Sequence, residues 1–283
     1  MSSLNQSPLN ALAMTAWWTA AARARESERP DRLFHDPWAM VLAGPEGLAD
    51  FDSSVAAQGN GTLDIQSIST RFFDEFLLNA TMARAIEQVV IVAAGLDTRG
   101  FRISWPDWTV LFELDQPSVL AYKESKLASV EARASCSRHV VGVDLNGQWI
   151  DLLCAEGFDR HRCSAWLLEG VLYFLPERAA ITILDAITFL SPPDSRLGFD
   201  VVNNAMLTAP ETRYWIERMD SIGVPWLFAC DKPEVSLANR GWKATVRQPG
   251  EGDAYFGRCP YPIAPRSIPG IPRSFLVTAE RVT

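Results

Sequence analysis

The sequence predicts an α/β protein built on a doubly wound, mostly parallel sheet, and two features of the chain carry this prediction. Short apolar runs of strand length recur from residue 88 onward, and helix-compatible segments separate them. The run Gln-Val-Val-Ile-Val-Ala-Ala-Gly at residues 88–95 is continuous and apolar, as in a strand that is buried on both faces of a parallel sheet. Strands that alternate with helices form right-handed βαβ units, which build such a sheet.

Helices are expected ahead of this sheet. Residues 8–25 are rich in Ala, Leu, Met and Trp, which are compatible with a helix, whereas the polar, glycine-containing residues 43–62 predict a loop. In residues 68–83 apolar side chains recur at the spacing of one helix face. We therefore predict an N-terminal helical extension over residues 1–85, which would serve as a lid, and one α/β domain over residues 86–283.

The elements of the sheet region follow one another in a regular order. After residues 88–95, strand-length runs lie at residues 110–113, 139–143, 165–168 and 196–202, and helix-compatible segments lie at residues 117–130, 148–156 and 176–190. Residues 242–246 and 274–279 predict two more strands. The chain between these last two is rich in Gly and Pro, which predicts mostly loop.

Composition and charge disfavour several kinds of partner. The chain has 283 residues, of which 48% are hydrophobic and 21% charged, and its 26 basic and 34 acidic residues give a net charge of −8. An acidic balance disfavours binding to nucleic acid. Its apolar runs stop well short of the roughly 18 residues that span a bilayer, and its first ten residues do not have the pattern of a signal peptide. The sequence predicts a cytoplasmic protein without membrane or nucleic-acid partners.

Cysteine and histidine spacing gives no sign of a metal site. The five cysteines form no C-x-x-C pair, and the three histidines do not stand with acidic residues at the spacing of metal ligands. We therefore expect no bound metal.

Acidic residues stand at or just past four consecutive strand ends. They are Asp97, Glu113 with Asp115, Asp144, and Glu169. In an open parallel sheet, ligands bind beyond the carboxyl ends of the strands. This lining therefore suits a cationic ligand that carries ribose hydroxyls. Each aspartate also has an ordinary alternative as a helix cap or turn residue.

Gly95 and Asp115 favour a nucleoside ligand without a phosphate. Gly95 lets the backbone approach a ligand closely. Asp115 follows it by 20 residues, the distance at which a carboxylate binds ribose hydroxyls in nucleotide-binding folds. The glycine pattern G-x-G-x-x-G and the phosphate-binding G-x-x-x-x-G-K-[ST] are both missing, which disfavours an NAD-linked reductase. S-adenosylmethionine fits these residues best.

Several motifs then match a known family in the same order. The matching segments include Ala22-Arg23-Ala24-Arg25-Glu26, Thr70-Arg71-Phe72-Phe73-Asp74, Phe112-Glu113-Leu114-Asp115-Gln116-Pro117 and Glu169-Gly170-Val171-Leu172-Tyr173-Phe174-Leu175-Pro176. Over residues 11–282 the chain resembles the S-adenosylmethionine-dependent methyltransferases of the leucine carboxyl methyltransferase type, in their bacterial branch of O-methyltransferases. The resemblance implies a class I (Rossmann-like) methyltransferase sheet with a seventh, antiparallel strand.

The resemblance also implies roles for individual residues. It implies that Arg71 holds the methionyl carboxylate of the cofactor, although Arg71 would otherwise be expected to pair on the helix surface with Asp74 or Glu75. The other implied cofactor contacts are Gly95 in the first turn, Asp115 at the ribose, Asp144 and Leu145 beside the adenine, and Glu169 near the methionyl amine or the ribose. Residues 205–269 match the family least, and there we expect acceptor recognition.

The predicted function is O-methylation of a small metabolite or natural product, with a carboxylate as the expected acceptor. An ionised carboxylate needs no general base, which agrees with the absence of a histidine–carboxylate pair from the motifs. A phenol or other hydroxyl would need one, and Tyr173 and His35 are then the first candidates. A regulatory protein that binds the cofactor without catalysis is a further alternative, and a homo-oligomer is left open.

Overall fold

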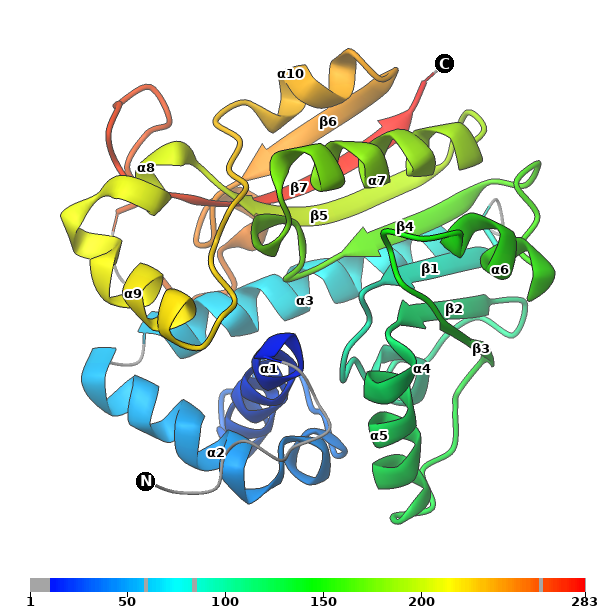
Figure 1. Cartoon of the computed structure of the whole chain (residues 1–283), viewed down its shortest axis with the longest axis horizontal. Coiled ribbons are helices and arrows are strands. Elements are labelled where there is room, and N and C mark those ends of the chain that lie inside the picture. The colour runs from blue at the N-terminus through cyan, green and yellow to red at the C-terminus, as the bar shows by residue number, and fades with distance from the viewer. Residues whose placement is uncertain (1–10, 59–60, 83–85, 260–261, 283) are drawn as a thin grey trace.

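A computed structural model describes residues 11–58, 61–82, 86–259 and 262–282. At its centre is a seven-stranded sheet in the order β3-β2-β1-β4-β5-β7-β6 (Figure 1). The strands are β1 Gln88–Val92, β2 Val110–Asp115, β3 Ser137–Gly142, β4 Ser164–Leu168, β5 Arg196–Val202, β6 Trp242–Arg247 and β7 Ser274–Arg281. Only β7 runs antiparallel to its neighbours. The α/β class, the doubly wound order and the single antiparallel strand are confirmed.

The helices connect the strands and precede the sheet. They are α1 Ala11–Glu28, α2 Ala39–Gln58, α3 Gly61–Met82, α4 Arg99–Arg102, α5 Pro117–Ala128, α6 Trp149–Ala155, α7 Glu177–Leu190, α8 Asn204–Thr208, α9 Arg213–Ser221 and α10 Pro233–Ala238. Short 3₁₀ turns are η2 Leu172–Phe174, η3 Pro210–Thr212 and η4 Gly252–Ala254. Of the predicted helices at residues 8–25 and 68–83, positions 8–10 and 83 lie outside the described residues.

The loop predicted at residues 43–62 is wrong, because most of that stretch is helical. The backbone leaves helical geometry at Gly44, whose φ of 64° is left-handed, and Pro45 then starts a new helical run within α2. Phe51 in this run is buried in a cluster with Leu42 and with alanines of α1. The glycine and proline therefore mark a kink, and packing against α1 keeps the segment helical.

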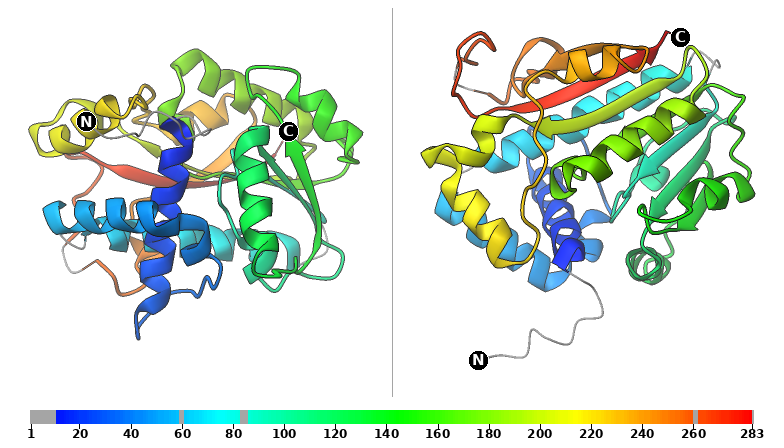
Figure 2. Two further views of the ribbon diagram at one scale, coloured as in Figure 1. Left: turned by 60° about the horizontal axis from the view of Figure 1, so that its bottom comes forward. Right: turned by 45° about the horizontal axis from the view of Figure 1, so that its top comes forward.

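Helices cover both faces of the sheet. Buried apolar residues of α6 and α7, such as Leu153 and Ile187, pack on one face. Residues of α3, such as Phe73 and Leu77, pack on the other. Figure 2 shows α3 running along the sheet on the side opposite α7. Helix α3 is thus a layer of the α/β core, while α1 and α2 form a third cluster with α5.

The topology brings several strand ends to one crevice. The strand order changes direction between β1 and β4, and in such sheets the ligand crevice opens at that point. Helix α1 crosses this edge, and its Ala16 Cβ lies 3.3 Å from where a Cβ on Gly95 would stand. The turns that follow β1, β2 and β4 can therefore contribute to one site.

Glu113, which was predicted to bind the cofactor, lies inside the fold. Its carboxylate accepts hydrogen bonds from Lys123 Nζ and from an Arg138 guanidinium nitrogen, both at 2.6 Å. The side chains of Glu113 and Lys123 are fully buried. This ion cluster joins β2 to α5 and β3.

The structure also bears on membrane spans and on the segment between the last two strands. No helix in the ranges that the structure describes is long and apolar enough to cross a membrane. The chain between β6 and β7 is mostly loop as predicted, since the described part of it contains only the short turn η4.

Removing the ammonium group of Lys123 should destabilise the fold without weakening cofactor binding. Lys123→Met leaves Glu113 with one cationic partner, and breaking a buried ion pair costs about 3–5 kcal/mol. We expect a loss near the lower end of that range in urea unfolding. Lys243→Met, on the exposed surface of β6, is the control and should change the free energy of unfolding by less than about 0.5 kcal/mol. Calorimetry with S-adenosylhomocysteine should give the wild-type affinity for the folded Lys123→Met protein, and a large loss would place Glu113 in the site.

Candidate functional site

A cavity of about 340 Å³ lies at the carboxyl ends of the strands. Its walls come from α1, α3, the turns after β1, β2 and β4, strand β5 and the segment with α8 and α9. Such a volume is in the usual range of small-molecule sites. Five predicted residues line it, namely Gly95, Asp97, Asp115, Glu169 and Tyr173. Arg71, Glu113, Asp144, Leu145 and His35 are not among its lining residues.

Asp115 is held against the turn that follows β1. Its carboxylate accepts hydrogen bonds from the backbone N–H groups of Gly95 and Gln116, each at 2.6 Å. Gly95 has a φ of +49°, a left-handed conformation that an L-residue adopts with strain. Burial raises the pKa of Asp115, although the two N–H groups and Lys123 oppose this. Each carboxylate oxygen keeps a further lone pair for a ligand hydroxyl.

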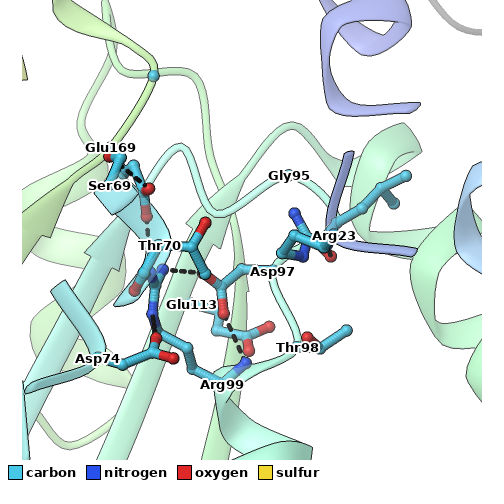
Figure 3. Close-up of polar contacts among 12 residues, drawn as sticks. Arg23, Ser69, Thr70, Asp74, Gly95, Asp97, Thr98, Arg99, Glu113 and Glu169 are labelled. Carbon is cyan, nitrogen blue, oxygen red and sulfur yellow. Dashed lines mark hydrogen bonds and ion pairs between the residues drawn. The ribbon is translucent and has the colours of Figure 1, made fainter. Parts of the chain in front are cut away.

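The buried guanidinium of Arg99 gathers three carboxylates at the centre of the site (Figure 3). Its side chain is 2% exposed, and it binds Asp74 of α3 at 2.7 Å and Glu169 at the end of β4 at 2.7 Å. It also pairs with Asp97 in the turn after β1. The second oxygen of Glu169 accepts a hydrogen bond from Ser69 Oγ at 2.9 Å. Three separate segments are thus fixed around one cation.

Charges in this network are unevenly balanced. Its connected ion pairs are Arg23–Asp36, Arg102–Asp36, Arg102–Asp74, Arg99–Asp74, Arg99–Asp97 and Arg99–Glu169. Three guanidinium groups therefore face four carboxylates. Burial would raise the pKa of Asp97, but the charges of Arg99, Lys123 and nearby arginines lower it to about 2. Asp97 therefore stays ionised, and by formal charge the network has one negative charge in excess for a cationic ligand.

Arg23 provides a cation in the cavity wall, whereas the family resemblance implied Arg71 as the cation for a ligand carboxylate. It lies on α1, donates to Asp36 Oδ2 at 2.9 Å and to the carbonyl of Leu96 at 2.6 Å, and lines the cavity. Figure 3 shows it beside the Gly95 turn. A guanidinium has five N–H donors, so donors remain available.

Arg71, in contrast, pairs with Glu75 one helical turn away, with an N–O distance of 2.6 Å, and its side chain is 41% exposed. The structure therefore places Arg71 in the surface pair that the sequence offered as the alternative.

The remaining predicted residues lie outside the cavity wall. Asp144 is exposed and accepts hydrogen bonds from the backbone and side-chain nitrogens of Asn146, at 2.9 and 3.0 Å. Leu145 is half-buried and packs against the core beneath α6 and α7. His35 is exposed in the segment between α1 and α2.

The outer part of the cavity is apolar and aromatic. Its lining includes Trp18, Phe174, Met206, Trp215, Ile222 and Trp226. Trp18 of α1 contacts Trp215 of α9 edge to face, with ring centroids 5.9 Å apart. Nearby, Arg218 of α9 donates to both carboxylate oxygens of Asp50 in α2, at 2.7 and 2.6 Å. The N-terminal helices and the segment predicted for acceptor recognition thus meet over one cavity.

Asp200 lies between the charged and the aromatic parts. It is the fifth residue of β5, is 9% exposed and lines the cavity. The backbone N–H of Gly170 donates to its Oδ1 at 2.7 Å, and the Tyr173 hydroxyl also interacts with it. Burial raises the pKa of Asp200 to about 7, with Glu169 adding to the shift and the Gly170 and Tyr173 hydrogen bonds opposing it. Burial, together with the charges of Asp200 and Glu169, raises the pKa of Tyr173 well above its ordinary value.

Arg23, Arg99 and Asp200 were missed at the level of the sequence. A signal existed for Asp200, because it is the single acidic residue in the otherwise apolar run at residues 197–202, and burying a carboxylate without a partner is costly. Arg23 lies in a segment that carried the family resemblance, and only the path of α1 shows that it reaches the strand ends.

Solved structures share this architecture. A protein from Thermobifida fusca, assigned as a methyltransferase, aligns with a TM-score of 0.63 at 16% identity, over 90% of this chain and 95% of its own. A DUF574-family protein of Streptomyces avermitilis aligns with a TM-score of 0.60 at 14% identity, over 89% of this chain and 97% of its own. At these identities the likeness concerns the fold.

Sequence relatives are closer. A protein of Saccharopolyspora erythraea, named as an S-adenosyl-L-methionine-dependent methyltransferase, is 36% identical over 96% of both chains. One from Mycobacterium avium with the same name is 40% identical over 77% of this chain and 74% of its own. The family model of leucine carboxyl methyltransferase matches residues 16–188. The cofactor is S-adenosylmethionine, and the chain is a methyltransferase that belongs to the leucine carboxyl methyltransferase family.

Proposed function

We propose that this enzyme transfers a methyl group to an oxygen atom of a small acceptor with a largely apolar body. The observation that carries the proposal is the division of the cavity into a charged inner part and an aromatic outer part. The inner part matches a cationic nucleoside, whereas the charged lining residues beside the aromatic part, Arg218 and Asp50, are paired with each other. A carboxylate or a hydroxyl on an apolar molecule is an acceptor that such a surface can admit.

The inner residues fit S-adenosylmethionine by charge and hydrogen bonding. Asp115 offers acceptor oxygens for the ribose hydroxyls, and the carboxylates bound to Arg99 favour the ammonium and sulfonium charges. Arg23 supplies donors for the methionyl carboxylate. When bound, the sulfonium supplies an activated methyl group, so the protein's main work is alignment and exclusion of water.

Helices α1, α2 and α9 support the exclusion of water. The Trp18–Trp215 contact and the Arg218–Asp50 ion pair join the N-terminal helices to α9 beside the cavity. Closing an active site strengthens the electrostatic interactions within it. In this proposal the N-terminal helices act as the cover of the acceptor.

The acceptor oxygen has two candidates. The family resemblance favours a carboxylate, which needs no base. The cavity favours a neutral hydroxyl, because each arginine in its described wall already has a carboxylate partner: Arg23 with Asp36, Arg99 with Asp97, and Arg218 with Asp50. The donors that remain on Arg23 are assigned here to the methionyl carboxylate, so an acceptor carboxylate would find no further cation among these residues.

Methyl-labelled S-adenosylmethionine tests the function directly. Incubated with the protein and an organic extract of bacterial cells, it should give extractable labelled product, and added S-adenosylhomocysteine should suppress the transfer. Tight binding of S-adenosylhomocysteine without transfer to any fraction would favour the regulatory alternative.

Asp115→Ala should weaken S-adenosylhomocysteine binding by about 1–3 kcal/mol through lost ribose hydrogen bonds. Titration calorimetry measures the change. Asp151→Ala is the matched control, because Asp151 is exposed on α6 and does not line the cavity. Equal affinities of Asp115→Ala and the wild type would remove Asp115 from the site.

Arg23→Met and Arg71→Met separate the two candidate cations. Because Arg23 lines the cavity, its loss should weaken S-adenosylhomocysteine binding by about 10- to 100-fold, the effect of a hydrogen bond to a charged group. Arg71→Met should stay within about twofold of the wild type, because an exposed helix pair contributes little. Circular dichroism checks that both variants are folded. The reverse order of effects would restore the role implied for Arg71.

A further inference from the structure

We propose that Asp200 is the general base of the reaction, and that the site accepts a flat apolar molecule through a neutral, phenol-type hydroxyl. This inference rests on the proposed function and specifies its acceptor.

Asp200 and Asp115 are the acidic residues of the described cavity wall that have no ion pair, and Asp115 differs from Asp200 in being bound to the backbone N–H groups of Gly95 and Gln116 and assigned to the ribose. Asp97 and Glu169 are bound by Arg99, and Asp50 by Arg218. Within the described ranges no ion pair joins Asp200 to an arginine, lysine or histidine. Its carboxylate interacts instead with the Gly170 N–H and the Tyr173 hydroxyl. A buried carboxylate that no cation neutralises is costly unless it can take up a proton.

Tyr173 links Asp200 to the aromatic wall. Its ring contacts Trp226 with centroids 4.9 Å apart and Phe174 at 4.7 Å, while its hydroxyl interacts with Asp200. Asp200 therefore lies within one side-chain length of an aromatic surface. A flat ring stacked there can present a hydroxyl to Asp200, and aromatic pairs of this kind favour such an arrangement.

The protonation states of the pair suit this assignment. With a pKa of about 7, Asp200 exchanges a proton near neutral pH, where a general base is most effective. Tyr173, with its raised pKa, keeps its proton and serves as a donor, so it is a poor base. The other acidic group facing Asp200 is Glu169, which is paired with Arg99 at 2.7 Å.

The step balances in atoms and charge. The acceptor O–H bond breaks and its proton passes to a carboxylate oxygen of Asp200. The oxygen's electron pair forms the new O–CH₃ bond as the carbon–sulfur bond of the donor breaks and its electrons stay on sulfur. The products are a methyl ether, S-adenosylhomocysteine and protonated Asp200, which returns its proton to solvent when the products leave.

Two probes with the same ring system test the acceptor class, namely 2-naphthol and 2-naphthoate. At pH 8 and with saturating S-adenosylhomocysteine, calorimetry should show 2-naphthol binding about tenfold or more tightly than 2-naphthoate, because like charges in a buried site are costly. Asp200→Asn should narrow this difference, because it removes one of the opposing charges. Binding of 2-naphthoate at least as tight as that of 2-naphthol, or of neither probe, would overturn the acceptor class.

The role of Asp200 as the base is tested by the pH dependence of the rate at which labelled product forms. In the wild type the rate should rise with pH, because the ionised form of Asp200 is needed as the base. The inflexion should lie at or below about 7, because the positive charge of the bound donor favours the ionised carboxylate. Asp200→Asn should lose about 100-fold or more in rate together with that inflexion, and Asp200→Glu should restore part of both. A variant that keeps the wild-type profile would overturn the role of Asp200.

The chemical nature of the product gives an independent result. A methyl ether survives mild alkali, whereas a methyl ester releases its label as methanol. Alkali-labile label would overturn the hydroxyl acceptor and leave methyl transfer intact. Failure of S-adenosylhomocysteine to bind the wild-type protein would instead contradict the proposed function itself, so the two failures are distinguishable.

Discussion

The buried ion cluster around Arg99 is the constraint on which the rest of the site depends. One guanidinium, almost without contact with solvent, holds carboxylates from α3, from the turn after β1 and from the end of β4. Charges removed from water in this way must be paired, and each partner then fixes the segment that carries it. The positions of the first turn and of Glu169 relative to α3 follow from this single side chain. Helix α3 is consequently both a layer of the core and a wall of the cavity.

The same cluster determines the charge of the inner cavity, which we propose as the donor site. Because carboxylates outnumber guanidinium groups in the network, the inner cavity carries excess negative charge without leaving any of these acids unpaired. A cationic donor is favoured there by fixed charges that need no rearrangement when it binds. Of the contacts that the family resemblance implied, Glu169 belongs to this network, whereas Arg71, Asp144 and Leu145 do not line the cavity. The network also explains why Arg23, which is part of it through Asp36, is positioned for a ligand whereas the exposed Arg71 is not.

Much of the fold could be predicted from the sequence, because buried parallel strands leave continuous apolar runs and strand ends collect acidic residues. The depth of each residue could not. Glu113 and Asp115 are two residues apart on one strand, and only the path of α5 shows that the first is covered while the second reaches the cavity. The helical conformation of residues 43–58 depends on burial against α1, which glycine and proline in the local sequence conceal. Likewise, the Gly-Phe-Asp-Val sequence at residues 198–201 indicates that Asp200 lies in a buried strand. That Asp200 faces Tyr173 depends on how η2 folds back over β5, which the sequence does not indicate.

The charged part and the aromatic part of the cavity come from different segments of the chain. Donor binding needs paired, immobile charges, and these come from α3 and the strands, where any substitution would disturb several ion pairs at once. The aromatic outer wall comes largely from α1, the η2 turn and the segment with α8 and α9, whose side chains make apolar contacts that tolerate exchange. Asp200 stands where these two parts meet, on a central strand but without a cationic partner. In the proposed function, its carboxyl group responds to the acceptor while the network assigned to the donor remains unchanged.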